Sequence, residues 1–145
     1  MSERTPFERI HGSCHCGNIR FTFERPGGPV DKIPVRACGC TLCRKHNASW
    51  TSHPDGRFSL RIEDADRATP YQFGTKTADF HLCQTCGVIP IVTSTLDGRR
   101  YAVVNIHSFD DFDSSRFDES PTDFDGEGIE DRLARRKRNW TPEAG

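Results

Sequence analysis

The seven cysteines are the clearest chemical feature of this 145-residue sequence, and they fall into three groups. Two of the groups share a local form, because in CHCG and CQTCG the last thiol precedes a glycine. Glycine can adopt a left-handed backbone conformation and so turn N–H groups toward sulfur. Two such turns, with two thiolates each, would complete the four tetrahedral ligands of a structural zinc. The ligands predicted for this site are Cys14, Cys16, Cys83 and Cys86.

The stretch ACGCTLC contains the other three cysteines, Cys38, Cys40 and Cys43, which we call the cysteine triad. A zinc with three protein ligands keeps a position open for water or substrate, which distinguishes catalytic zinc from structural zinc. Three thiolates around a divalent ion favour a further soft sulfur ligand and leave a net charge of about −1. Arg44 and Lys45 follow directly and could offset this charge or hold a substrate carboxylate. The sequence therefore predicts a catalytic triad with Arg44 and Lys45 as substrate-binding residues.

Other interpretations of the triad stay open at this stage. His46, three residues after Cys43, could close a structural site with three cysteines and one histidine. Disulfides or simple buried thiols are disfavoured by the spacing, by the odd number of cysteines and by the reducing conditions of the cytoplasm. The remaining histidines near the cysteines receive no role, because a lone histidine is more often a hydrogen-bonded residue than a ligand. They are His15, His53 and His81.

Composition limits the class of protein. A length of 145 residues with 34% hydrophobic residues suits one compact domain. Twenty Lys and Arg against 21 Asp and Glu give a formal charge of −1, so we expect no nucleic-acid or membrane partner. No apolar run approaches the roughly 20 residues of a membrane span, and residues 1–13 lack the apolar stretch of a secretory signal. We therefore expect a soluble, cytoplasmic protein.

Short segments rich in β-branched and aromatic residues predict a mainly β fold with mostly antiparallel strands. The segments are residues 19–24, 57–63, 69–74, 78–83, 88–95 and 100–106. Asp97 and Gly98 predict a tight two-residue hairpin turn between the last two segments. Pro90 predicts an edge strand or a bulge, because proline has no N–H to donate to a neighbouring strand. The four-cysteine zinc site would join strands that lie far apart in the sequence.

Helices are predicted at residues 41–49 and, with a longer pattern, at residues 128–140. Residues 109–131 are dense in acidic and turn-forming residues, and the ligand spacing of a calcium loop is absent there. We expect an irregular extension held by its phenylalanines, Phe109, Phe112, Phe117 and Phe124. The basic run RLARRKR follows ten acidic residues, which predicts a solvated helix with compensated charge rather than a nucleic-acid surface.

The order C-x-C, C-x-C-x2-C and C-x2-C-G, together with YQFGTKTADFHLCQTCGV and YAVVN, resembles the glutathione-dependent formaldehyde-activating enzyme family. This family also contains centromere protein V. The resemblance covers about residues 11–126. It implies a β-tent fold of antiparallel sheets with one structural zinc at the four cysteines and a second, more labile zinc at the triad. It also divides the chain into a zinc domain, residues 1–126, and a C-terminal helical tail, residues 127–145.

The activity that the resemblance implies is condensation of formaldehyde with glutathione to S-(hydroxymethyl)glutathione, classed as a carbon–sulfur lyase reaction. Its partners would be a small thiol such as glutathione and an aldehyde, while the oligomeric state is left open. As a hypothesis, the open zinc lowers the pKa of the thiol so that the thiol is ionised at neutral pH, and no residue stands out as a general base. The competing hypothesis is a non-enzymatic, zinc-stabilised binding module, in which the triad is structural and the acidic extension docks a partner.

Overall fold

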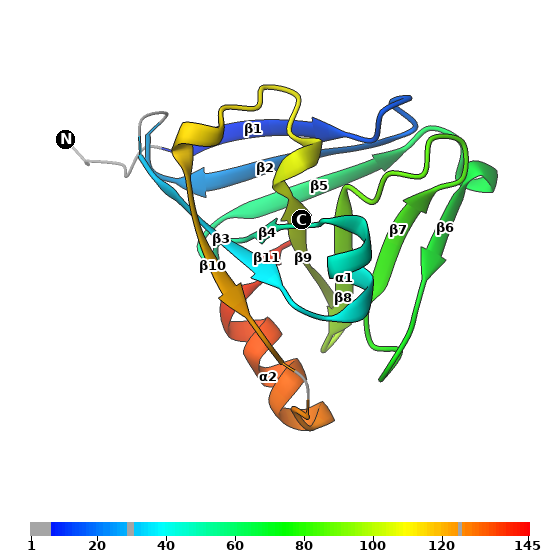
Figure 1. The fold of residues 1–145 in the computed structure, drawn as a ribbon, viewed down its shortest axis with the longest axis vertical. Helices are drawn as coiled ribbons and strands as arrows, with labels where there is room; N and C mark the ends of the chain where they lie inside the picture. The colour runs from blue at the N-terminus through cyan, green and yellow to red at the C-terminus, as the bar shows by residue number, and fades with distance from the viewer. Residues whose placement is uncertain (1–6, 29–30, 125) are drawn as a thin grey trace.

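Two β-sheets form the body of the protein, seen in a computed structural model that describes residues 7–28, 31–124 and 126–145 (Figure 1). The described part is mainly β with a short helix near the C-terminus, which confirms the predicted fold class. The smaller sheet is antiparallel and has the strand order β1-β2-β5. Its strands are β1 (Phe7–Ser13), β2 (Ile19–Pro26) and β5 (Arg57–Ile62).

The larger sheet has a strand order that differs from the order along the chain. Its strands are β10 (Phe117–Thr122), β3 (Ile33–Cys38), β4 (Trp50–Thr51), β9 (Arg99–Asn105), β8 (Ile91–Leu96), β7 (Asp79–Cys83) and β6 (Ala68–Tyr71). Neighbouring strands are antiparallel except β10 and β3, which run parallel. The short strand β11 (Thr141–Pro142) pairs with β9. The larger sheet therefore contains strands from β3 to the C-terminal β11, whereas the N-terminal strands β1 and β2 lie in the smaller sheet.

The main hydrophobic core is formed by side chains from both sheets. Ile19, Phe21 and Phe23 alternate along β2 with more exposed residues, as expected for a strand with one buried face. They belong to one cluster with buried residues of β3, β5, β8 and β9. The rings of Phe21 and Phe109 meet edge to face, with their centroids 6.2 Å apart. This core holds the two sheets together and so places the cysteine-bearing turns relative to one another.

The predicted hairpin at Asp97 and Gly98 is confirmed, since β8 and β9 pair across this turn and both residues have positive φ angles. The prediction for Pro90 is wrong. Pro90 lies immediately before β8, and β8 is an interior strand of the larger sheet. The missing N–H is therefore outside the ladder, while the Pro90 carbonyl accepts a hydrogen bond from the backbone N–H of Asn105 at 2.8 Å.

The prediction of an irregular extension at residues 109–131 is also wrong in part, because β10 forms there. Two short 3-10 turns, η2 (Ile106–Ser108) and η3 (Ser114–Arg116), lead into β10, which pairs along the whole of β3. The Phe117 ring packs beside that of Phe109, with 5.9 Å between centroids. Backbone pairing with a neighbouring strand, together with this aromatic contact, outweighs the turn-forming composition. The sequence pattern also missed β1, β3, β4 and β11.

Both predicted helices are present, and each has a feature that the sequence pattern did not indicate. Helix α1 (Thr41–His46) ends earlier than predicted, because Asn47 has a left-handed conformation with φ of 52°. Helix α2 (Ile129–Asn139) matches the longer prediction. The prediction of a fully solvated helix is wrong at Arg136, which is buried. Trp140, directly after α2, belongs to a second hydrophobic cluster with Trp50 of β4 and Val92 of β8, so the C-terminal segment packs against the larger sheet.

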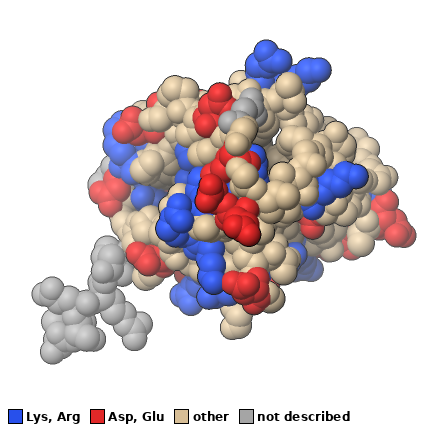
Figure 2. All heavy atoms as spheres, turned by 90° about the horizontal axis from the view of Figure 1, so that it is seen from below, with Lys and Arg blue, Asp and Glu red and all other residues tan. Residues whose placement is uncertain are grey.

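Charge is mixed on one face of the molecule. Figure 2 shows acidic and basic side chains interspersed on the face seen from below, in keeping with the formal net charge of −1. No helix in the described ranges is long and apolar enough to cross a membrane. The 3-10 turn η1 (Ala65–Arg67), which precedes β6, completes the described elements.

Candidate metal centres and active-site pocket

The four cysteines predicted to form one metal site do lie together. Cys14 and Cys16 follow β1, whereas Cys83 ends β7 and Cys86 lies in the next turn. The four sulfur atoms all lie within 4.8 Å of one another, with 3.5 Å between the sulfurs of Cys16 and Cys83. We call this group the four-cysteine cluster. The cluster connects the smaller sheet to the larger one through cysteines that lie about 70 residues apart in the sequence.

Backbone N–H groups surround the four-cysteine cluster as predicted from its glycines. Gly17 and Gly87 have φ angles of 85° and 79°, values that residues with a Cβ atom rarely adopt. The backbone N–H of Ile19 donates to the Cys14 sulfur at 3.3 Å. Burial acts to raise the pKa of the Cys83 thiol, but hydrogen bonds from nearby backbone N–H groups outweigh it and lower the pKa to about 6. Such donors stabilise thiolate, the form that binds metal.

The cysteine triad forms a second, separate group. Cys38 ends β3, Cys40 caps the N-terminus of α1, and Cys43 lies within α1, with the three sulfurs inside 4.8 Å of one another. The Cys40 sulfur accepts a hydrogen bond from the Cys43 backbone N–H at 3.4 Å. The indole Nε1 of Trp50 donates to the Cys43 sulfur at 3.3 Å.

Two thiols of the triad have a raised pKa, as does Cys14 of the four-cysteine cluster, where burial raises the pKa to about 11. A hydrogen bond with the Cys38 thiol and then burial raise the pKa of Cys43, while the Trp50 indole acts in the opposite direction. Burial also raises the pKa of Cys40. Crowded, buried thiols of this kind are unfavourable as three free anions, whereas a divalent cation among them would compensate their charge.

Both groups therefore fit a metal ion by their donor chemistry. None of the seven cysteines, all within the described ranges, forms a disulfide, and each group offers sulfur atoms that converge on one point. Either group could hold a metal ion and is compatible with zinc, which accepts four thiolates in a closed site or three in an open one. That zinc occupies these sites stays a prediction.

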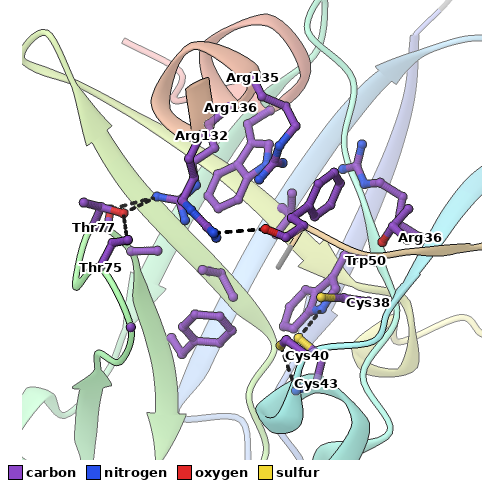
Figure 3. Close-up of a pocket in the computed structure, with 18 of the residues that line it drawn as sticks. Arg36, Cys38, Cys40, Cys43, Trp50, Thr75, Thr77, Arg132, Arg135 and Arg136 are labelled. Atoms are coloured by element: carbon purple, nitrogen blue, oxygen red, sulfur yellow. Dashed lines mark hydrogen bonds between the residues drawn. The ribbon is translucent and has the colours of Figure 1, made fainter. Parts of the chain in front are cut away.

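The triad forms part of the lining of a cavity of about 310 Å3 (Figure 3). Apolar and aromatic side chains make up much of the wall, among them Trp50, Phe80 and Val92. Trp50 and Phe80 meet edge to face, with 6.1 Å between ring centroids. The volume lies at the lower end of the range typical of small-molecule sites, roughly 300 to 1,000 Å3. The four-cysteine cluster does not line this cavity.

Two sequence predictions place cations and a histidine beside the triad, and the structure puts all three residues elsewhere. Arg44, Lys45 and His46 are exposed on α1, and none of them lines the cavity with the triad. His46 instead lines a separate hollow with Asn105. It does not join the group of three converging sulfurs. A histidine ligand and these two cations therefore find no support in the geometry.

Four arginines line the cavity instead, and sequence analysis missed all of them as site residues. Arg36 comes from β3, while Arg132, Arg135 and Arg136 come from α2 (Figure 3). The spacing of the last three, at i, i+3 and i+4, places them on one face of a helix. This spacing could have indicated a shared arginine face, although the composition of the segment suggested a solvated helix.

The other histidines have ordinary surroundings. His15 is exposed between its two cysteine neighbours. His81 is buried on β7 and shares a hydrogen bond of 2.8 Å with the hydroxyl of Thr93, while burial lowers its pKa. His53 accepts a hydrogen bond from the backbone N–H of Asp55 at 3.1 Å. None of the three lines the cavity.

A mainly β fold with a closed group of four thiols and an open group of three defines a cysteine-rich β protein that could hold two metal ions. The model of the glutathione-dependent formaldehyde-activating enzyme family matches residues 9–124, and the chain belongs to this family. This confirms the resemblance drawn from the cysteine spacing.

Two similar proteins are consistent with this membership. A protein of Halomonas elongata named "Putative glutathione-dependent formaldehyde-activating enzyme" is 29% identical over an alignment of 84 residues that covers 53% of this chain. The match spans about half of that relative, 51% of its length. A crystal structure of a Rhodobacter sphaeroides protein has a TM-score of 0.58 and 28% identity, covering 77% of this chain and 98% of the other.

Proposed function

We propose that the protein forms or cleaves the carbon–sulfur bond of an adduct between a thiol and an aldehyde, with S-(hydroxymethyl)glutathione as the first adduct to test. Family membership supports the formaldehyde-activating reaction in outline. The observation that carries the proposal is the position of the triad, whose three sulfurs converge at the wall of a cavity. The four-cysteine cluster lies outside that cavity, which suits a structural role.

The reaction needs a sulfur nucleophile and a place for one proton. In the forming direction, the thiol sulfur bonds to the aldehyde carbon, the carbon–oxygen π bond breaks, and the thiol proton ends on the new hydroxyl group. A zinc ion held by Cys38, Cys40 and Cys43 would supply a position at which a thiol is ionised at neutral pH. Among the described residues, no carboxylate or imidazole lines the cavity. We therefore propose that the proton exchanges with water at the mouth of the cavity.

The chain's own residues would orient the reactants. The Trp50 indole holds the Cys43 sulfur through its N–H group, and its ring contributes to the apolar wall beside the triad. Phe80 and Val92 extend this wall, which limits the access of water to the reacting atoms. In this proposal residues 1–126 form the zinc domain, and the helical tail at 127–145 completes the cavity with the arginines of α2.

The binding-module alternative requires a fourth protein ligand at the triad. Among the described His, Cys, Asp and Glu residues, no fourth side chain converges with the three sulfurs. The cavity beside the triad also has the size of a small-molecule site. Both observations favour the enzyme over the module.

Two measurements test the proposal on zinc-loaded protein. X-ray absorption at zinc should show a higher average number of sulfur neighbours after glutathione is added, and Cys40→Ser should abolish that increase. Exchange spectroscopy of the glutathione–formaldehyde adduct should show faster exchange with protein present than without it. An unchanged sulfur count would exclude thiol binding at the triad, and an unchanged exchange rate would exclude this adduct as substrate.

A further inference from the structure

Arg136 is a buried cation without a carboxylate partner. Its side chain comes from α2, and the residue is 7% exposed. Its Nη1 donates to the hydroxyl of Thr77 at 2.8 Å and to that of Ser94 at 3.2 Å. No ion pair joins it to a carboxylate in the described ranges. Burial, and then repulsion by Arg132 and Arg135, lower its pKa to about 10. A buried charge is costly unless an opposite charge accompanies it.

The neighbouring arginines add positive charge and do not compensate the charge of Arg136. Glu127 contacts two of them, lying 3.0 Å from Nη2 of Arg135 and 3.9 Å from Nε of Arg132. Arg36 donates to the hydroxyl of Ser52. Glu127 itself does not line the cavity. Four arginines therefore line the cavity, and Glu127 forms ion pairs with two of them.

Unsatisfied donors gather at the same place. Among the described residues, four buried side-chain polar atoms lack a hydrogen-bond partner. Three of them belong to residues that line the cavity, namely Nε of Arg132, Nε of Arg136 and the hydroxyl of Thr122. Native proteins rarely leave buried donors unpaired, and such groups commonly mark a site for an ion or ligand. An anion that accepts hydrogen bonds would satisfy these donors and would also compensate the charge of the arginines.

We propose that Arg36, Arg132, Arg135 and Arg136 form an anion subsite that binds a dianionic group at the end of the substrate opposite its sulfur. The inference rests on the proposed function for the chemistry at the triad, whereas the anion subsite itself can be tested without it. In the view of Figure 3, the three arginines of α2 and the triad stand on different sides of the cavity. A substrate can therefore place its sulfur at the triad and its charged end at α2.

The positive charge of the subsite favours thiols that carry a doubly negative group and no ammonium group. Glutathione carries two carboxylates, but an ammonium group lies beside one of them, and no lining residue in the described part is acidic. A phosphate monoester or a pair of carboxylates without an ammonium group matches the arginines better, because guanidinium groups bind such anions through two parallel hydrogen bonds. Arg132, Arg135 and Arg136 lie beyond the residues that match the family, 9–124. Three of the four arginines of the subsite thus come from outside the family match, and Arg36 comes from within it.

Binding of simple dianions tests the subsite directly. Trp50 and Trp140 both line the cavity and are the two tryptophans of the chain, so their fluorescence reports on its occupancy. Full-length, zinc-loaded protein should bind inorganic phosphate or succinate saturably and more tightly than S-methylglutathione, which keeps the charges of glutathione but has no thiol to bind zinc. Tighter binding of phosphate indicates a phosphate ester, and tighter binding of succinate indicates a dicarboxylate. Absence of saturable binding for both dianions, or tighter binding of S-methylglutathione than of either, would overturn the proposal.

Substitutions on α2 test whether dianions bind at the subsite itself or are attracted by the overall positive charge of the helix. Arg132→Gln and Arg136→Gln should each weaken dianion binding by at least about tenfold, the loss expected for one charge-assisted contact. Arg138→Gln is the matched control, because Arg138 is exposed on the same helix and does not line the cavity. Arg132→Gln keeps the test valid if the buried Arg136 is needed for folding. Equal affinity in Arg132→Gln, Arg138→Gln and the parent protein would contradict the inference.

The triad variant distinguishes failure of this inference from failure of the proposed function. Cys40→Ser should keep dianion binding, because the subsite is built from arginines. If Cys40→Ser and the parent protein bind phosphate equally while adduct exchange is not accelerated, the subsite stands and the proposed substrate fails. If adduct exchange is accelerated and no dianion binds, the function stands and the subsite fails.

Discussion

The indole Nε1 of Trp50 donates a hydrogen bond to the sulfur of Cys43 over 3.3 Å, which connects β4 to α1 at the wall of the cavity. Trp50 is 5% exposed and packs edge to face on Phe80, so the orientation of its ring is determined by the surrounding core. The bond acts to lower the pKa of Cys43, against neighbouring thiols and burial, which raise it. Trp50 thus belongs both to the hydrophobic core and to the surroundings of the triad.

Trp50→Phe should weaken zinc binding at the triad while the protein stays folded. Phenylalanine retains most of the aromatic packing but cannot donate to sulfur, and loss of such a supporting contact typically lowers metal affinity by about 10-fold to 100-fold. Competition with a coloured chelator measures the affinity. Trp140→Phe is the matched control, because Trp140 is buried at the same cavity but has no hydrogen bond to a cysteine sulfur among its described contacts. Equal losses in both variants would contradict a specific role for the indole N–H.

Removal of metal should proceed in two unequal steps. Four thiolates complete the shell of one zinc, whereas three leave the other accessible to competing ligands. We expect zinc-replete protein to contain two zinc ions per chain and a mild chelator to remove one of them without loss of the β-sheet circular dichroism signal. Metal analysis before and after chelation provides the measurement. A single zinc per chain in replete protein would disprove the division into two sites.

Substitution of one ligand in each cysteine group should show which group the fold requires and which group serves the reaction. Cys86→Ser should abolish folding, because structural zinc contributes about 10 to 16 kcal/mol in small metal domains, more than the stability of most folds. Cys40→Ser should leave the fold intact, since the triad lies at the cavity and not between the sheets. Thermal unfolding of both variants is the measurement. If Cys40→Ser lowers the melting temperature as much as Cys86→Ser, the triad is structural and the binding-module alternative gains.

Acid should destabilise the attachment of the segment before α2 to that helix, because Glu127 forms ion pairs with Arg132 and Arg135 of α2. Hydrogen bonds from Arg135 hold the pKa of Glu127 below its usual range. Since the folded pKa lies below the unfolded value of about 4.3, the stabilisation is complete above that value and is lost as the pH falls through the folded pKa. Glu127→Gln should lower stability by about 0.5 to 1 kcal/mol at neutral pH, and the difference from the parent protein should vanish in acid. Thermal unfolding from about pH 6 down to about pH 3 measures the difference. A constant difference across this range would show that Glu127 acts by packing alone.

The cysteine grouping and the fold class could both be predicted from the sequence. Both depend on short-range patterns: the last thiol of each knuckle precedes a glycine, and Gly17 and Gly87 do adopt positive φ angles. The β8–β9 hairpin likewise follows from Asp97 and Gly98, which suit a tight turn wherever it lies in the fold. Helix α2 was predictable because it is long enough for its pattern to be unambiguous.

Which cationic side chains line the cavity with the triad depends on the tertiary structure. Arg44 follows Cys43 in sequence, but successive residues of a helix turn by about 100°, so a buried Cys43 directs its neighbour elsewhere. Arg132 and Arg136 lie about 90 residues further along the chain and reach the cavity because α2 packs on the larger sheet. Likewise, β10 forms only because β3 offers it an edge in parallel register. Proximity of this kind depends on how distant segments bury their apolar surface, and no local pattern encodes it.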